Sequence, residues 1–160
     1  MTSPDISESW IDPIFNAIMS DVLASGHFVQ VNVTESEVSP SYGLTANLWL
    51  QEMRPVGQIS GLASSSGLLV FVLRIYCAMT MSPGDEIDPK LTRAASNLMR
   101  RWHDDYDFGG VCRNVDLLGI TGTQLRYNAG YYYDEKGDLK FRIGDITIPV
   151  IVDDIWPQIN

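Results

Sequence analysis

The sequence predicts an α+β protein of two layers, in which a mostly antiparallel or mixed sheet of about five to six strands carries two amphipathic helices on one face. Two patterns predict this fold: apolar residues recur at helical spacing in two segments, and they alternate or run together in several strand-length segments. At 160 residues the chain has the size of one domain. We therefore expect a single domain over 1–160, with a polar leader at 1–10 and a C-terminal tail at 153–160 that leaves the sheet.

Both helices are predicted from an aspartate-proline pair followed by a periodic apolar stripe. Asp12-Pro13 and Asp88-Pro89 combine a side-chain acceptor for free N–H groups with a residue that suits the first helical position. The first stripe stops before Gly26, which predicts a helix over about Pro13–Ser25. The second stripe ends near Trp102, which predicts a helix of similar character.

The strands are predicted from alternating or continuous apolar runs. The run Leu68–Met79, interrupted only by Arg74, predicts a central strand with both faces covered. Gly144-Asp145 predicts a bulge in the last strand, and the hairpin loop 134–137 places Gly137 where a positive φ is needed. The predicted strands are Phe28–Val33, Leu44–Met53, Leu68–Met79, Val111–Leu118, Leu125–Tyr133 and Leu139–Val152, and the predicted loops between the first three are Thr34–Tyr42 and Arg54–Gly67.

The charge and the apolar pattern exclude several classes of protein. With 20 acidic and 11 basic residues the net charge is −9, whereas a broad grip on nucleic-acid phosphates needs clustered Lys and Arg. A channel through which DNA slides without binding suits such an acidic protein. No apolar run approaches the about 20 residues that cross a bilayer, and the first residues do not resemble a secretion signal. Cys77 and Cys112 lie in apolar stretches and are interpreted as buried free thiols.

Residues that could carry catalysis, a metal or a cofactor do not form a recognisable pattern. His27 and His103 have no ligand partner at a spacing typical of metal sites. Ser64–Ser66 lie in a glycine-containing segment without the flanking residues of a nucleophile elbow or the Lys-Ser/Thr end of a phosphate-binding loop. We expect no catalytic residue, no metal and no cofactor, and interpret the protein as not being an enzyme.

Two clusters are candidates for contacts with other molecules. Tyr131, Tyr132 and Tyr133 alternate between the faces of a strand, so one or two of the rings turn away from the core beside Arg126 and Arg142. These aromatics mark either a protein interface or cross-strand aromatic pairs. The second cluster is acidic and follows the second helix, where a solvated surface is the simpler interpretation; it comprises Asp104, Asp105 and Asp107.

Six segments, in this order along the chain, resemble tail terminator proteins of long-tailed, siphovirus-type bacteriophages of actinobacteria. The likeness spans nearly the whole chain and depends on the joint order of the segments, because each one alone is weakly specific. The segments are Ile11–Met19, Ser60–Leu68, Glu86–Pro89, Arg113–Gly119, Ala129–Tyr131 and Ile146–Trp156.

The resemblance implies a structural protein of the virion, assembled in the cytoplasm of the bacterial host and located at the head–tail junction. It would assemble with itself, as a hexameric ring, on the major tail tube protein and dock onto stopper or neck proteins, while DNA passes through without specific binding. The Arg54–Gly67 loop, with Arg54, Gln58, Ile59 and Leu62, is then expected to contact a neighbouring subunit or the tube. The acidic cluster is expected to face the channel.

Three other functions remain open from the sequence. A head-completion or stopper protein of the phage neck would differ in its partners, and would purify with portal or adaptor proteins instead of the tube. A small-molecule-binding α+β domain would need a concave apolar pocket with convergent polar groups. A host-directed interaction protein would be a stable monomer with one exposed aromatic patch.

Overall fold

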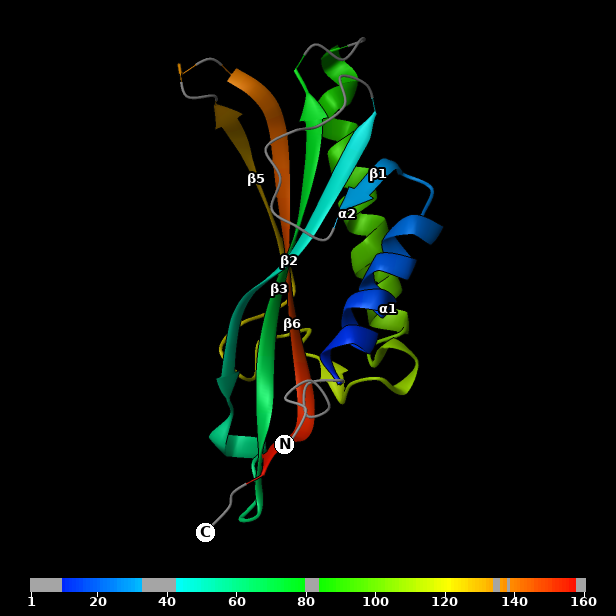
Figure 1. Ribbon diagram of the computed structural model, residues 1–160. Helices are drawn as coiled ribbons and strands as arrows, with labels where there is room; N and C mark the ends of the chain where they lie inside the picture. Colours follow the sequence, from blue (N-terminus) through cyan, green and yellow to red (C-terminus); the bar gives the residue numbers. More distant parts are fainter. Residues whose placement is uncertain (1–9, 33–42, 80–83, 134–135, 138, 158–160) are drawn as a thin grey trace, which may run out of the picture.

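The computed structural model describes residues 10–32, 43–79, 84–133, 136–137 and 139–157. Figure 1 shows one long, twisted sheet with both helices on the same face, which confirms the predicted α+β class. The predicted Thr34–Tyr42 loop lies wholly outside the described residues. The elements are α1 (Ile11–Ala24), β1 (Phe28–Asn32), β2 (Leu44–Pro55), β3 (Ser64–Ala78), α2 (Ile87–Asp104), β4 (Asn114–Val115), β5 (Arg126–Tyr133) and β6 (Leu139–Pro157), with short 3-10 turns at Gly57–Ile59, Gly84–Glu86 and Phe108–Gly110.

The sheet is mixed and has six strands, in the order β1-β2-β3-β6-β4, with β5 also paired to β6. Only β1 and β2 run parallel among these pairs. The pairing of β3 with β6 is the longest, and extends from Ser64 opposite Pro157 to Ala78 opposite Phe141. The prediction of a central strand with both faces covered is confirmed, because most β3 side chains are buried on either face.

The main core lies between the sheet and the two helices. Alternate residues of β3, among them Phe71, turn toward the helices because successive side chains of a strand point to opposite faces. The Phe15 ring of α1 meets the Phe71 ring edge-on at 4.9 Å. The predicted helical stripes supply the other half of this core: Ile14, Ile18 and Val22 from α1, and Leu91, Ala94, Ala95, Leu98 and Trp102 from α2.

The helix ends differ slightly from the predicted ones. Helix α1 begins at Ile11, so Asp12 lies in its first turn instead of capping it, and Trp10 at the cap position makes no side-chain cap hydrogen bond. Asp88 likewise lies in the first turn of α2. Acidic residues in a first turn still interact favourably with the positive end of the helix dipole. Gly26 follows α1 with φ of 75°, as its position predicted.

The second face of the sheet carries two small apolar clusters with polar residues between them. Val56, Leu68, Val70 and Ile151 form one cluster near the β2–β3 turn. At the other end of the sheet a mainly aromatic cluster comprises Tyr76, Ala78, Phe141 and Ile143, with Tyr132 against it.

Four predictions about the strands and their ends differ from the structure. The loop predicted over Arg54–Gly67 is too long at both ends: Arg54 pairs with Leu68 and Pro55 with Gly67, which leaves 56–63 as the connection. The tail predicted to leave the sheet at 153 continues in β6 to Pro157. Its serine partners in β3 explain this, because Ser66 Oγ accepts a hydrogen bond from the Asp154 N–H at 3.2 Å.

The predicted strand Val111–Leu118 is also wrong, because only Asn114–Val115 pair with β6. The predicted bulge at Gly144-Asp145 is absent: Gly144 and Asp145 stay in register with Ile75 and Arg74. Gly144 serves a different purpose, since a Cβ there would overlap the ring of Tyr127. Within the predicted hairpin loop 134–137, Gly137 has φ of 83°, as expected, while 134 and 135 lie outside the described residues.

A buried carboxylate joins the two helices. Asp21 of α1 accepts hydrogen bonds from Arg101 Nε at 2.9 Å and from Trp102 Nε1 at 3.0 Å, both on α2. Trp102 is fully buried, so its indole N–H has no access to water in place of this acceptor. The apolar stripes bring the helices together, and Asp21 fixes how they align.

A second buried carboxylate shapes the segment between β4 and β5. Asp116 accepts hydrogen bonds from the backbone N–H groups of Gly119, Ile120 and Thr121 at 2.8–3.1 Å, and from the Thr121 hydroxyl. Burial alone raises the pKa of Asp116, but the hydrogen bonds from Thr121, Ile120 and Gly119 outweigh it, so the pKa lies below its ordinary value.

Replacing Asp21 by Ala tests the link between the helices. We expect the free energy of unfolding to fall by about 2 kcal/mol, because a buried donor without an acceptor costs roughly 1–3 kcal/mol. Asp21→Asn retains a carbonyl acceptor and should lose less. Urea unfolding at neutral pH measures both variants, and equal stability of wild type and Asp21→Ala would contradict this role.

Asp116→Asn tests the second carboxylate through pH. Because the folded pKa is lowered, the stabilisation by Asp116 is complete above the unfolded pKa of about 3.9 and is lost as the pH falls through the folded value. We expect the variant to be about 1–3 kcal/mol less stable at neutral pH, with the difference shrinking in acid. Urea unfolding at about pH 3 and about pH 7 measures this, and a pH-independent difference would refute it.

Candidate functional site

Side chains that could perform chemistry are spread over the described residues instead of converging. No group of three or more His, Cys, Asp or Glu side chains in this part of the chain could hold a metal ion. His103 Nδ1 lies 2.7 Å from the Met99 carbonyl oxygen in its own helix, and the His27 ring contacts the Phe28 ring. Nor does any described helix combine the length and the apolar character needed to span a bilayer.

The serines singled out in the sequence have a structural role. Ser60 Oγ donates to the Val56 carbonyl at 2.5 Å and accepts from the Ser66 N–H at 3.1 Å. Ser66 Oγ donates to the Ile59 carbonyl at 3.1 Å, and Ser64 Oγ donates to Asp154 Oδ1 at 2.5 Å. These hydroxyls close the connection between β2 and β3 and join it to β6.

The connection Val56–Ala63, here called the hairpin end, is the first exposed surface. Figure 1 places it at the bottom, where β2 and β3 extend beyond both helices. Leu62 is 98% exposed and Gln58 is also exposed, whereas Ile59 packs against the nearby apolar cluster. Arg54 is not part of the hairpin end, because its guanidinium turns back to donate to the Thr121 carbonyl at 2.8 Å.

The three consecutive tyrosines are divided between the faces of β5. Tyr132 lies on the second face, where its ring is 6.0 Å from Phe141. Tyr131 and Tyr133 lie on the opposite face and are exposed. The Arg142 guanidinium lies 4.2 Å from the centre of the Tyr131 ring, and Arg142 Nε donates to Asp88 at 2.8 Å. Cross-strand aromatic pairing and exposed aromatics are therefore both present in this strand.

The three acidic residues predicted as a cluster have different roles after α2. Asp105 Oδ1 accepts from the Gly109 N–H at 2.9 Å, so this carboxylate holds the turn that follows the helix. Asp104 is exposed, and Asp107 is partly exposed. Two carboxylates therefore present charge to solvent, where a negative charge near a helix C-terminus gains nothing from the helix dipole.

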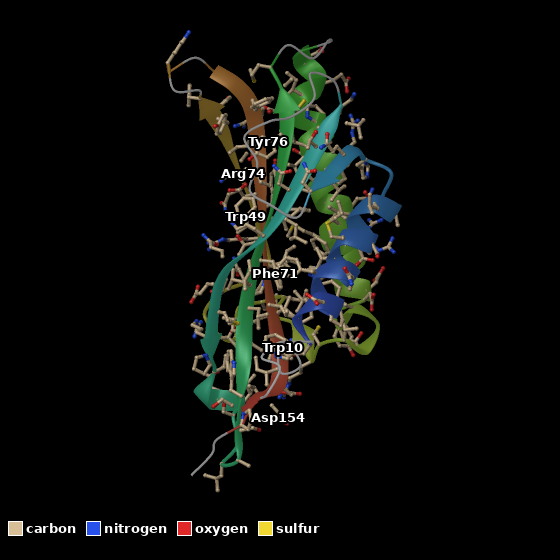
Figure 2. The ribbon with its side chains drawn as sticks, viewed as in Figure 1. Trp10, Trp49, Phe71, Arg74, Tyr76 and Asp154 are labelled. Atoms are coloured by element: carbon tan, nitrogen blue, oxygen red, sulfur yellow. The ribbon has the colours of Figure 1, made fainter. Side chains whose placement is uncertain are left out.

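A half-buried ion pair with an aromatic partner lies on the second face of the sheet. Arg74 donates from two nitrogens to both Asp145 oxygens, at 2.8 and 3.0 Å, and its guanidinium lies 5.3 Å from the centre of the Trp49 ring (Figure 2). The hydrogen bonds to Asp145 raise the pKa of Arg74 despite its partial burial. Arg74, which interrupts the apolar run in the sequence, is thus fully engaged within the sheet.

A further surface was missed by the sequence interpretation. The turn after β4 carries Leu118 and Ile120, which are 83% and 81% exposed. They line a shallow depression with Tyr106, Val115 and Leu117, here called the 106–120 groove. The prediction of a strand over Val111–Leu118 concealed it. Two glycines in the sequence could have indicated a turn here instead of a strand. Gly119 and Gly122 both have positive φ and lie in a tight turn beside exposed apolar residues.

The predicted surfaces do not form one site. Tyr131 is opposite Arg142 on β6, and Ser64 beside the hairpin end is opposite Pro157. These positions are about 50 Å apart along the strand at a rise of about 3.3 Å per residue. The surfaces therefore suit contacts with several neighbouring molecules more than a single ligand.

Comparison with known proteins finds a likeness among solved structures. No family model matches the chain, and no curated protein matches it. Among solved structures, the chain is similar to the sheath/tube terminator of the extracellular contractile injection system PVC, seen in its extended state by cryo-EM. The TM-score is 0.39 and the identity 10%, over 92% of this chain and 58% of that chain. The chain thus spans less than two thirds of that protein's length.

Proposed function

We propose that this protein is a subunit of a ring that caps the tail tube of a long-tailed bacteriophage. The ring ends tail polymerisation and forms the surface on which the head is joined. The observation that carries the proposal is the resemblance of six ordered segments, from Ile11 to Trp156, to tail terminator proteins of siphophages. The protein acts through the fit of its surfaces and performs no reaction.

The geometry of the described residues suits such a role. Exposed large apolar side chains lie at separate places on an elongated sheet, including the hairpin end and the 106–120 groove. A cyclic ring, proposed to be hexameric, uses two different patches on each subunit, because every contact is head to tail. Further surfaces then remain for the tube below and for the neck above.

Capping follows from a difference between the two sides of the ring. One side binds the last ring of tube subunits, and the other side offers no copy of the tube's own binding surface. Addition of further tube protein therefore stops. The side turned to the head would bind stopper or neck proteins instead.

The channel of the ring would be compatible with DNA passage. The net charge of −9 opposes adhesion to phosphates, and Asp104 and Asp107 are the carboxylates of the acidic cluster that remain available to line the channel. Asp105 is a weaker candidate, because it holds its own turn. A ring structure with Asp104 and Asp107 on the outer rim would reject this part of the proposal.

Electron microscopy of the purified protein with isolated tail tubes tests the proposed function. We expect rings at one end of each tube, and tubes incubated with the ring should no longer elongate when tube protein is added. Co-purification with portal or adaptor proteins, with bare tube ends, would instead indicate a stopper of the neck.

A variant of the hairpin end tests whether it takes part in capping. Deletion of Gln58–Ser66 would remove the first residues of β3, so the substitution Leu62→Ser is the sharper change. We expect a fold as stable as that of wild type, because Leu62 is almost fully exposed, and a loss of capped tubes of about tenfold or more. Leu23→Ser, at a leucine of α1 that is 61% exposed, is the control and should cap normally. Normal capping by Leu62→Ser would exclude the hairpin end.

A further inference from the structure

The hairpin end presents an apolar residue on a segment that contains no charged residue of its own. Leu62 is the most exposed large apolar side chain among the described residues. The whole segment 55–73 lacks Asp, Glu, Lys and Arg, in a chain of which 19% is charged. A leucine held in water at the tip of a projecting turn gains free energy when a partner covers it.

The hairpin end is held in one shape before any partner arrives. The Gly61 N–H donates to the Ser64 carbonyl at 3.0 Å, and the Val56 N–H donates to the Ser66 carbonyl at 2.9 Å. The hydroxyls of Ser60 and Ser66 add the bonds described above. A turn fixed in this way loses little conformational freedom on binding, so the apolar contact of Leu62 is not offset by ordering of the chain.

The 106–120 groove has the matching character. Its exposed members Leu118 and Ile120 stand beside Tyr106, and the two charged residues at its margin are engaged elsewhere. Arg113 Nη1 lies 3.0 Å from Asp153, and the Asp116 carboxylate accepts the backbone bonds of its own turn. The groove therefore offers an apolar surface without an unpaired charge that an apolar partner would have to bury.

The two surfaces cannot meet within one chain. The groove adjoins β4, which is paired to β6 at Val150 and Ile151, whereas Ser64 beside the hairpin end is paired to Pro157. These positions are about 20 Å apart along β6. In Figure 1 the hairpin end is accordingly at the bottom, with the yellow turn after β4 above it. A contact between them therefore joins two molecules.

We propose that Leu62 of one copy inserts between Tyr106, Leu118 and Ile120 of the next copy, and that this contact joins the subunits of the assembly. The closure of these contacts into a ring rests on the proposed function. The contact joins two different patches, so each copy uses its hairpin end toward one neighbour and its groove toward the other.

A second copy fits the groove better than a small ligand does. Three polar residues of its lining already have partners, so they are not available to orient a small molecule: Arg113 pairs with Asp153, the Asn114 side chain donates to the Val115 carbonyl, and Asp116 accepts the bonds of its own turn. The insertion of a single leucine needs only apolar walls. Each copy supplies both the insert and the groove, in equal number.

Cross-linking of engineered cysteines in the full-length chain tests the contact. The double variant Leu62→Cys/Leu118→Cys, treated with a short bis-maleimide at neutral pH, should give a ladder of dimers, trimers and larger species. A mixture of the two single variants should give dimers only, because each copy then carries one of the two positions. Each single variant alone should remain uncross-linked.

The native thiols supply little background in this experiment. Cys77 is buried, and burial with nearby aspartates raises the pKa of Cys112 to about 12, so little reactive thiolate is present at neutral pH. Wild type treated with the reagent measures what remains. Leu23→Cys/Leu118→Cys is the matched control, with an exposed leucine on α1 replaced instead, and should give no ladder.

Two results would overturn the inference. The first is cross-linking of Leu62→Cys with itself, which indicates a two-fold contact. The second is the lack of a ladder from the double variant at every protein concentration up to the solubility limit.

Sedimentation of Leu62→Ser should show self-association about tenfold to a hundredfold weaker than wild type. Because the ladder is scored without tubes, a ladder without capping refutes the proposed function alone. Capping without a ladder refutes this contact alone.

Discussion

The antiparallel pairing of β3 with β6 determines where every other element lies. These two strands are paired from the hairpin end to the aromatic cluster at Tyr76 and Phe141. Strand β2 adds to the free side of β3, while β4 and β5 share the free side of β6. Both helices then cover the apolar face that this framework presents. The hairpin end and the 106–120 groove keep a fixed separation because both are anchored to β6.

The helices and the central strands were predictable because their patterns are local. The stripes of α1 and α2 and the continuous run of β3 each extend over several turns or pairs, so small errors at the ends change little. The segments that were mispredicted depend on partners far away in the sequence. In the sequence, residues 153–157 resemble a polar tail. In the structure they continue β6, because Ser64 and Ser66 of β3 supply their hydrogen-bond partners. Gly144 in a strand is typical of a bulge, but here a glycine is needed because the Tyr127 ring occupies the space where a side chain would lie.

The candidate surfaces were only partly visible in the sequence. Alternation along β5 predicted that one or two of the three tyrosine rings turn away from the core, but it did not indicate which, because that depends on the face that packs against Phe141. Leu118 was not predicted to be exposed, since an apolar residue in a predicted strand is ordinarily assigned to the core, and Ile120 lies outside every predicted strand and helix. Their exposure depends on the turn that Asp116 holds through its hydrogen bonds. The sequence alone does not indicate that this aspartate is buried and binds the N–H groups of the turn. The sequence likewise does not indicate that the Arg54 guanidinium turns away from the hairpin end, because its acceptor, the Thr121 carbonyl, is distant in the chain.

The order of β3 and β6 along the chain has a consequence during translation. Strand β3 emerges from the ribosome early, and its partner residues, which begin at Phe141, emerge near the end. Until then an apolar strand rich in β-branched and aromatic residues, with Arg74 as its one charged residue, has only β2 to pair with, and such segments are prone to aggregate. Pairing between distant segments also folds slowly. Strand β3 is therefore the part of the nascent chain that is most exposed to aggregation until β6 has been made.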